Sequence, residues 1–171
     1  MPYDELRTLD DDVDIIGKRV LLRVAYDVPI RTSDVGDQRS EITDDTRIRV
    51  TVSTIQRLLD ANCSIVICGG WLGRPNGIDP ALRMNPIAVR LAELLGRAVQ
   101  KLDDCVGPAV DEAVRGMQPG EIILLENTRF HPEEKDNNPT FVQQLSSLGE
   151  LCVFDAFAQA HRDHASVCGI A

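Results

Sequence analysis

Three arginine residues each follow a short apolar segment of the chain, a few residues after that segment ends. They are Arg74, Arg129 and Arg162, and a fourth arginine, Arg47, starts a stretch of helical period. Guanidinium groups donate paired hydrogen bonds that match the geometry of phosphates and carboxylates. These residues therefore predict a site for a small phosphorylated or carboxylated anion. The alternative left open is that each arginine is solvated or pairs with one of the 27 Asp and Glu residues.

The elements that would position these arginines alternate along the chain. Short apolar runs alternate with stretches of helical period, which is typical of βαβ units around a parallel sheet. Most of the runs are apolar on both faces, as strands covered by helices on both sides should be. We therefore expect an α/β fold with three layers, a doubly wound parallel sheet flanked by helices, in a single domain over residues 1–171. The expected strands are residues 19–24, 64–69, 98–102, 121–125 and 151–155.

Four helices are expected between the strands. The first has Ile48, Val52, Ile55 and Leu59 on one face, with a start signal at residues 43–45. The other three helices run from Asn85 to Gly96, from Pro108 to about Met117 and from Pro139 to about Leu148.

Ligands of open parallel sheets bind beyond the carboxyl ends of the strands, where the arginines above are expected.

Composition argues against several classes of function. The formal net charge of -9 disfavours nucleic acid and anionic membranes as partners. No apolar run approaches the roughly 20 residues that span a bilayer, and the acidic N-terminus lacks the features of a targeting segment. We therefore expect a soluble cytoplasmic protein. Five cysteines without a Cys-x-x-Cys pair predict neither a disulfide framework nor a zinc site.

The histidines allow a metal site as one interpretation. His161, Asp163 and His164 are close in sequence, and imidazole and carboxylate groups can bind zinc. We expect no metal there. His131 closely follows Arg129 and is expected to be a structural hydrogen-bonding residue rather than a general base.

Five segments of the chain are long and unusual in sequence: 17–29 (GKRVLLRVAYDVP), 42–49 (ITDDTRIR), 72–75 (LGRP), 124–134 (LLENTRFHPEE) and 155–171 (DAFAQAHRDHASVCGIA). In order and spacing they resemble the N-terminal domain of the phosphoglycerate kinase family. In that family the N-terminal domain holds 3-phosphoglycerate, and a separate C-terminal domain holds the magnesium nucleotide. The resemblance implies that Arg47 stabilises the transferring phosphoryl group and that Arg74, Arg129 and Arg162 grip the 3-phosphate end. It also accounts for both histidines of residues 161–164 without a metal.

The implied pocket departs from the family pattern at several positions. Ala25 replaces an aspartate that accepts a hydrogen bond from the substrate hydroxyl, and Asp27 replaces an asparagine donor. Trp71 replaces a histidine before Leu-Gly-Arg-Pro, and Ala158-Gln159 replaces a Gly-Thr pair. Losing two charge-assisted contacts of about 1.5–3 kcal/mol each would weaken binding roughly a hundredfold to several thousandfold. We therefore do not expect 3-phosphoglycerate to bind in the usual way.

Two functions stay open at this level. The first is a non-catalytic binding or scaffold subunit with a residual anion site, associating with a protein partner or with itself through the face that the second domain of the family would cover. The second is a truncated or split kinase half that transfers phosphoryl from 1,3-bisphosphoglycerate to ADP only with a nucleotide domain in trans. The chain has no Gly-x-x-x-x-Gly-Lys-Ser/Thr loop, and we expect the nucleotide-binding C-terminal domain, and hence Mg-ATP or Mg-ADP, to be absent from it. The changes at Ala25, Asp27, Trp71 and Gln159 all fall around one pocket, which favours the first function.

Overall fold

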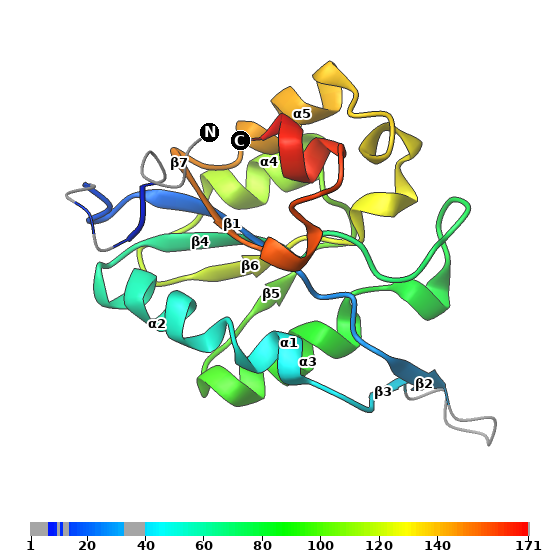
Figure 1. The fold of residues 1–171 in the computed structure, drawn as a ribbon. Helices are drawn as coiled ribbons and strands as arrows, with labels where there is room; N and C mark the ends of the chain where they lie inside the picture. Colours follow the sequence, from blue (N-terminus) through cyan, green and yellow to red (C-terminus); the bar gives the residue numbers. More distant parts are fainter. Residues whose placement is uncertain (1–6, 10, 12–13, 33–39, 171) are drawn as a thin grey trace.

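A computed structural model describes residues 7–9, 11, 14–32 and 40–170. Five parallel strands form one sheet in the order β5-β6-β4-β1-β7 (Figure 1). The chain moves outward from β1 in one direction and later returns to the opposite side of β1 for β7, so the sheet is doubly wound as expected. The strands are β1 (Arg19–Val24), β4 (Ser64–Cys68), β5 (Gln100–Lys101), β6 (Ile122–Leu124) and β7 (Leu151–Asp155).

Helices cover both faces of this sheet and complete the expected three layers. Figure 1 shows α1 (Thr46–Arg49), α2 (Val52–Asp60) and α3 (Asn85–Leu95) below the sheet, and α4 (Pro108–Arg115) and α5 (Pro139–Ser146) above it. Alternate residues of β1, β4 and β6 pack into two separate cores, one under each helical layer. This two-sided burial explains why these central strands are mostly apolar, whereas the short edge strand β5 consists of Gln100 and Lys101.

The first predicted helix is divided into two. α1 ends before Val50, and α2 begins after Thr51. The Thr51 hydroxyl donates to the Ile48 carbonyl (2.8 Å) and lies 2.7 Å from the Tyr26 hydroxyl. These bonds hold the buried Thr51 at the break between the two helices. Because of this break, α2 buries Ile55 and Leu58, whereas the predicted core residues Val52 and Leu59 are only half-buried.

The other helix boundaries agree with the predicted stop and start signals. Gly96 follows α3 in the left-handed conformation (φ 62°), which suits a residue without a side chain. The Asn138 side chain accepts hydrogen bonds from the backbone N–H groups of Thr140 (3.0 Å) and Phe141 (3.2 Å) at the start of α5. α4 and α5 end at Arg115 and Ser146, two residues before the expected limits.

Several short elements were not predicted. β2 (Ile30–Thr32) and β3 (Ser40–Ile42) pair antiparallel in a small separate sheet that projects at the lower right of Figure 1. The loops at the carboxyl ends of the strands carry single helical turns: η2 (Pro80–Leu82), η3 (Thr128–Phe130), η4 (Pro132–Glu134), η5 (Phe157–Gln159) and the π-helical η6 (Ala165–Gly169).

No helix in the described part of the chain is long and apolar enough to span a membrane.

Candidate anion-binding site

A buried arginine on β1 organises the carboxyl edge of the sheet. Arg23 is fully buried, and its Nε donates to the carbonyl (2.8 Å) and Oγ (3.0 Å) of Ser166. Its Nη2 donates to Gln159 Oε1 (2.8 Å), and its Nη1 donates to the Val24 carbonyl. Ser166 in turn donates through its N–H (3.1 Å) and Oγ (2.6 Å) to the buried Glu134 carboxylate. One hydroxyl therefore connects a buried cation to a buried anion, which limits the cost of burying either charge.

Trp71 lies on this buried guanidinium. The centroid of the Trp71 ring is 5.2 Å from Cζ of Arg23 and 4.2 Å from Cζ of Arg129. The same centroid is 4.9 Å from the centroid of the His164 ring. Only 4% of Trp71 is exposed. The preceding Gly70 has φ 69°, and a Cβ atom there would lie 2.5 Å from Arg23 Nη2, so a glycine is required for this close approach.

Arg129 stands over Trp71 and brings two further arginines into the group. Its Nη1 donates to the Gly73 carbonyl (2.8 Å), whereas its buried Nε has no hydrogen-bond partner. Burial lowers the pKa of Arg129, and the charges of Arg162 and Arg74 lower it further against the opposing effect of Asp27. The structure thus brings three of the four predicted arginines together.

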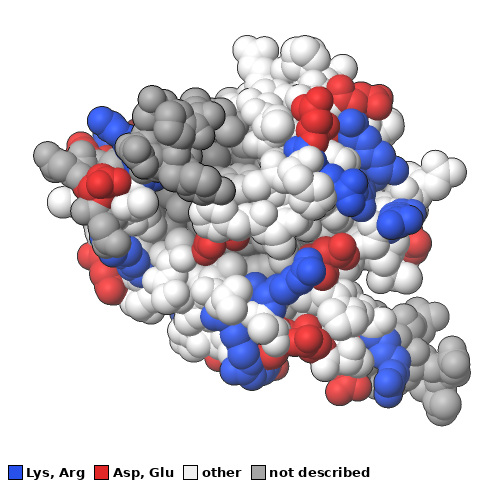
Figure 2. Space-filling view, in the orientation of Figure 1, with Lys and Arg blue, Asp and Glu red and all other residues white. Residues whose placement is uncertain are grey.

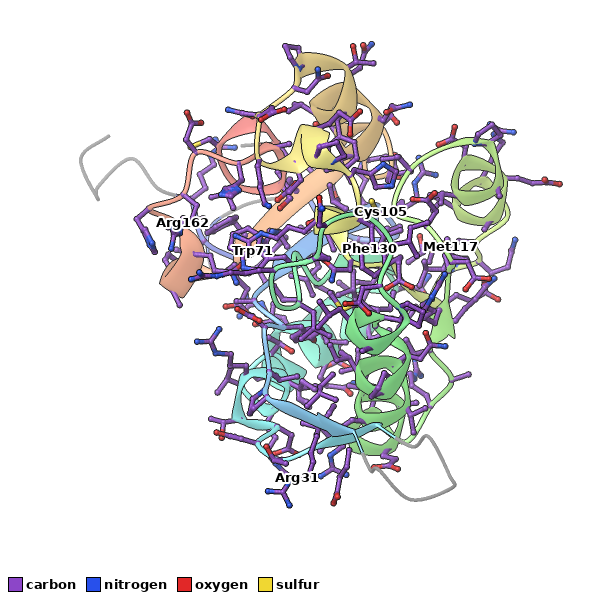
Figure 3. The ribbon with its side chains drawn as sticks, turned by 90° about the vertical axis from the view of Figure 1, so that its right-hand side faces the viewer. Arg31, Trp71, Cys105, Met117, Phe130 and Arg162 are labelled. Carbon is purple, nitrogen blue, oxygen red and sulfur yellow. The ribbon has the colours of Figure 1, made fainter. Side chains whose placement is uncertain are left out.

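The side chains of Arg74 and Arg162 are exposed and, within residues 7–9, 11, 14–32 and 40–170, form no hydrogen bond or ion pair. In the described part of the chain these two arginines are therefore solvated rather than paired with acidic residues, which is one of the two forms of the alternative left open above. Figure 2 shows Lys and Arg atoms gathered at the right of the molecule, beyond the carboxyl ends of the strands. Figure 3 places Arg162 and Trp71 at the same side of the fold.

Arg47 is not tied to this group. Arg47 is exposed on α1, which lies on the same face of the sheet as α2 and α3. Hydrogen bonds with Thr46 lower the pKa of Asp44, and the charge of Arg47 makes a smaller contribution in the same direction. Among the described residues, no hydrogen bond or ion pair joins Arg47 to the other three arginines.

The positions that depart from the family pattern surround the same arginines. Asp27 Oδ1 accepts a hydrogen bond from the Gly73 N–H (3.0 Å), so its carboxylate holds the loop that carries Arg74. Gln159 is 5% exposed and bonded to Arg23, and Ala25 is half-buried at the end of β1. Asp27, Trp71 and Gln159 each interact with Arg23, Arg129 or the Gly73 loop, whereas the structure records no contact between Ala25 and these arginines in the described part of the chain.

His164 lies beside the arginine group, with its ring against Trp71, unlike His161 and Asp163. Burial lowers the pKa of His164, as do the nearby charges of Arg129, Arg162 and Arg23, with Glu134 acting in the opposite direction. Its buried Nδ1 has no hydrogen-bond partner among the described residues. Asp163 instead accepts a hydrogen bond from Asn137 (2.7 Å), and His161 is exposed.

Sequence reasoning missed Arg23, Glu134 and Ser166. An arginine inside the apolar run RVLLRV was a usable signal for Arg23, because a charge in a buried strand needs partners. No comparable signal marks Glu134 or Ser166, since the contact between them depends on how the loops fold.

The fold and this edge define a parallel α/β domain with a group of arginines beyond the carboxyl ends of its strands. Comparison with known proteins identifies the group to which it belongs. The model of the phosphoglycerate kinase family matches residues 10–171, and the chain belongs to that family.

Individual relatives agree with this assignment. The chain is 49% identical over 158 residues to phosphoglycerate kinase of Gloeobacter violaceus, covering 92% of this chain and 37% of that protein. It is 47% identical over 161 residues to that of Moorella thermoacetica, covering 94% and 39%. The crystal structure of phosphoglycerate kinase from Pyrococcus horikoshii superposes with a TM-score of 0.80 at 30% identity, covering 92% of this chain and 38% of that one. The chain therefore spans less than two fifths of the length of these relatives.

Proposed function

We propose that this domain keeps an anion site of the phosphoglycerate kinase family without its selectivity for 3-phosphoglycerate, and that it acts as a non-catalytic binding or scaffold subunit. The observation that carries this proposal is the indole of Trp71, which is buried between the guanidinium groups of Arg23 and Arg129. The proposal has two parts, which concern charge and selectivity.

The charge for an anion is present. Arg74 and Arg162 are exposed, and the charges of both act on Arg129, whose Nη1 donates to the Gly73 carbonyl. A phosphate has oxygen acceptors on all sides and can bind several such donors at once. In a protein of net charge -9, this local positive group is where a small anion would collect.

The groups that would select a glycerate are weakened. Ala25 offers no acceptor to a substrate hydroxyl, and the Trp71 indole has one N–H donor and no acceptor. The Asp27 carboxylate is already bonded to Gly73 and adds negative charge beside Arg129. A ligand is therefore expected to be held by its phosphate alone.

Calorimetric titration with 3-phosphoglycerate and with inorganic phosphate tests this proposal. We expect the natural protein to bind both anions weakly and with similar affinity. The Ala25→Asp, Trp71→His double variant should gain affinity for 3-phosphoglycerate of roughly a hundredfold or more, with little change for phosphate. Arg162→Met should lose phosphate binding, whereas Arg115→Met, which removes an exposed arginine on α4, should keep it. Tight binding of 3-phosphoglycerate by the natural protein would contradict the proposal.

A kinase half that works in trans is the second candidate. It is favoured by the grouping of Arg74, Arg129 and Arg162 and by the close superposition on the Pyrococcus horikoshii enzyme. The test mixes the chain with the separately expressed C-terminal half of the Gloeobacter violaceus relative, Mg²⁺, ADP and 1,3-bisphosphoglycerate. ATP formation above the level of that half alone, and lost in Arg47→Met, would support the kinase half and overturn the non-catalytic proposal.

A further inference from the structure

Asp104, Cys105 and His131 bring three different metal-binding groups together away from the anion site. The carboxylate, thiol and imidazole ligand atoms all lie within 4.8 Å of one another. We propose that these three residues bind one Zn²⁺ or a similar divalent transition-metal ion. The spacing of cysteines and histidines along the chain predicted no zinc site. Such spacing reveals only ligands that are close in sequence, whereas Asp104, Cys105 and His131 come from two separate loops.

The donor set suits a borderline-soft ion. Thiolate and imidazole ligands favour zinc and its neighbours, and a carboxylate commonly completes such a site. Around a tetrahedral zinc ion, with bonds of about 2.0–2.3 Å, neighbouring donor atoms are roughly 3.4–3.6 Å apart. His131 Nε2 and Asp104 Oδ1 are now 2.7 Å apart in a hydrogen bond. Binding therefore requires this pair to open by under about 1 Å and the thiol to approach, with a water molecule as fourth ligand.

The two loops that carry the ligands are already held in place. Asp104 follows β5, and its carbonyl accepts a hydrogen bond from the N–H of Glu126 after β6 (3.3 Å). Its Oδ1 also accepts from the Cys105 N–H (2.7 Å), which fixes the carboxylate beside the thiol. The His131 N–H donates to the Thr128 carbonyl (3.1 Å). Little chain entropy would be lost on binding, because the backbone of all three ligands is ordered without metal.

Access and surroundings also favour a cation. The side chains of Asp104 and His131 are 52% and 29% exposed, so they can meet an ion from solvent, and the fully buried Cys105 lies beneath them. Burial raises the pKa of the Cys105 thiol, and the carboxylates of Asp104, Glu134 and Glu126 raise it further, so a bound cation must displace the thiol proton to solvent while it offsets their negative charge. Figure 3 shows Cys105 well separated from Trp71 and Arg162, so an ion here would not occupy the anion site.

Titration with Co²⁺, a coloured substitute for Zn²⁺, tests the proposal on the intact protein under reducing conditions. We expect one equivalent to produce a thiolate-to-cobalt charge-transfer band, which one equivalent of Zn²⁺ then abolishes. Cys105→Ser should lose the band, and His131→Gln should weaken Co²⁺ binding at least about tenfold. Cys152→Ser and Cys168→Ser each remove an exposed thiol outside the cluster and should leave the band unchanged.

Three results would overturn the metal site. They are the absence of a thiolate band in the natural protein, a band that persists in Cys105→Ser, and a band that disappears in Cys168→Ser. If Cys105→Ser does not fold, the partly exposed ligands decide the question: unchanged Co²⁺ affinity in both His131→Gln and Asp104→Asn would mean that the Asp104–His131 hydrogen bond only tethers two loops.

Discussion

Arg23 is the residue on which the candidate site is built. A guanidinium group in a fully buried strand is costly unless each donor is satisfied, and here Ser166, Gln159 and the Val24 carbonyl accept from it. The Trp71 ring centroid lies 5.2 Å from Cζ of the same group, so the position of the buried indole depends on this cation. Arg23 therefore links the stability of β1 to the placement of Trp71.

Replacing Arg23 should be strongly destabilising. Arg23→Met leaves Gln159 without its partner and the Glu134–Ser166 pair without a neighbouring cation, so we expect a loss of about 3–5 kcal/mol in the free energy of unfolding. Urea denaturation followed by circular dichroism measures this loss. Arg115→Met at the exposed end of α4 is the matched control and should change stability by less than about 0.5 kcal/mol. Equal effects of the two variants would show that the buried network contributes no specific stability.

His164 should make stability dependent on pH. Its folded-state pKa lies below the ordinary value, so between these two values the unfolded chain binds more protons and stability falls as pH decreases from about 6.5. Urea midpoints measured from pH 7 to pH 5 should therefore decline less steeply in His164→Gln than in the natural protein. His161→Gln, at an exposed position, should keep the natural slope. A steeper decline in His164→Gln would reverse the predicted sign.

Elements could be predicted from the sequence wherever local signals and packing agree. The five strands were found from their apolar runs, and the helices from signals at their ends: Gly96 after α3, and Pro108 and Pro139 at the starts of α4 and α5. The break between α1 and α2 was not found, because it depends on a hydroxyl contact between Thr51 and Tyr26 from different elements. The arginine group was expected from the strand ends, whereas the Asp104–Cys105–His131 cluster was not, since its members come from separate loops.

The start of α5 gives a prediction at the scale of one element. Asn138 accepts from two backbone N–H groups that would otherwise have no partner in the helix, so Asn138→Ala should lower the free energy of unfolding by about 1 kcal/mol. Because η6 packs on α5, the variant should also shift the NMR signals of residues 165–169. Gln144→Ala, on the exposed face of the same helix, should leave both the stability and these signals nearly unchanged. Thermal unfolding measures the stability difference, and a similar loss in both variants would argue against the cap.

At the scale of the whole molecule, β7 forms one edge of the sheet and β5 forms the other. β7 is the last strand in the sheet order, and among the described residues no strand pairs with its outer side. Phe157, just after β7, is 73% exposed, and its ring centroid is 6.2 Å from that of Phe154. An open strand edge beside exposed aromatic surface favours association with another chain. This edge is therefore where we expect the scaffold role to be carried.

We accordingly expect the protein to self-associate through β7 and Phe157, as measured by sedimentation velocity over a range of concentrations. Phe157→Ser should weaken association at least about tenfold, since it removes an aromatic anchor worth some 1.5–3 kcal/mol. Val89→Ser, at an exposed position on α3, should leave association unchanged. Added salt should strengthen association, because it screens the repulsion between two copies of charge -9, but it should weaken phosphate binding at the arginines. A monodisperse monomer at all concentrations, with no protein partner in a native pull-down, would contradict this role for the edge.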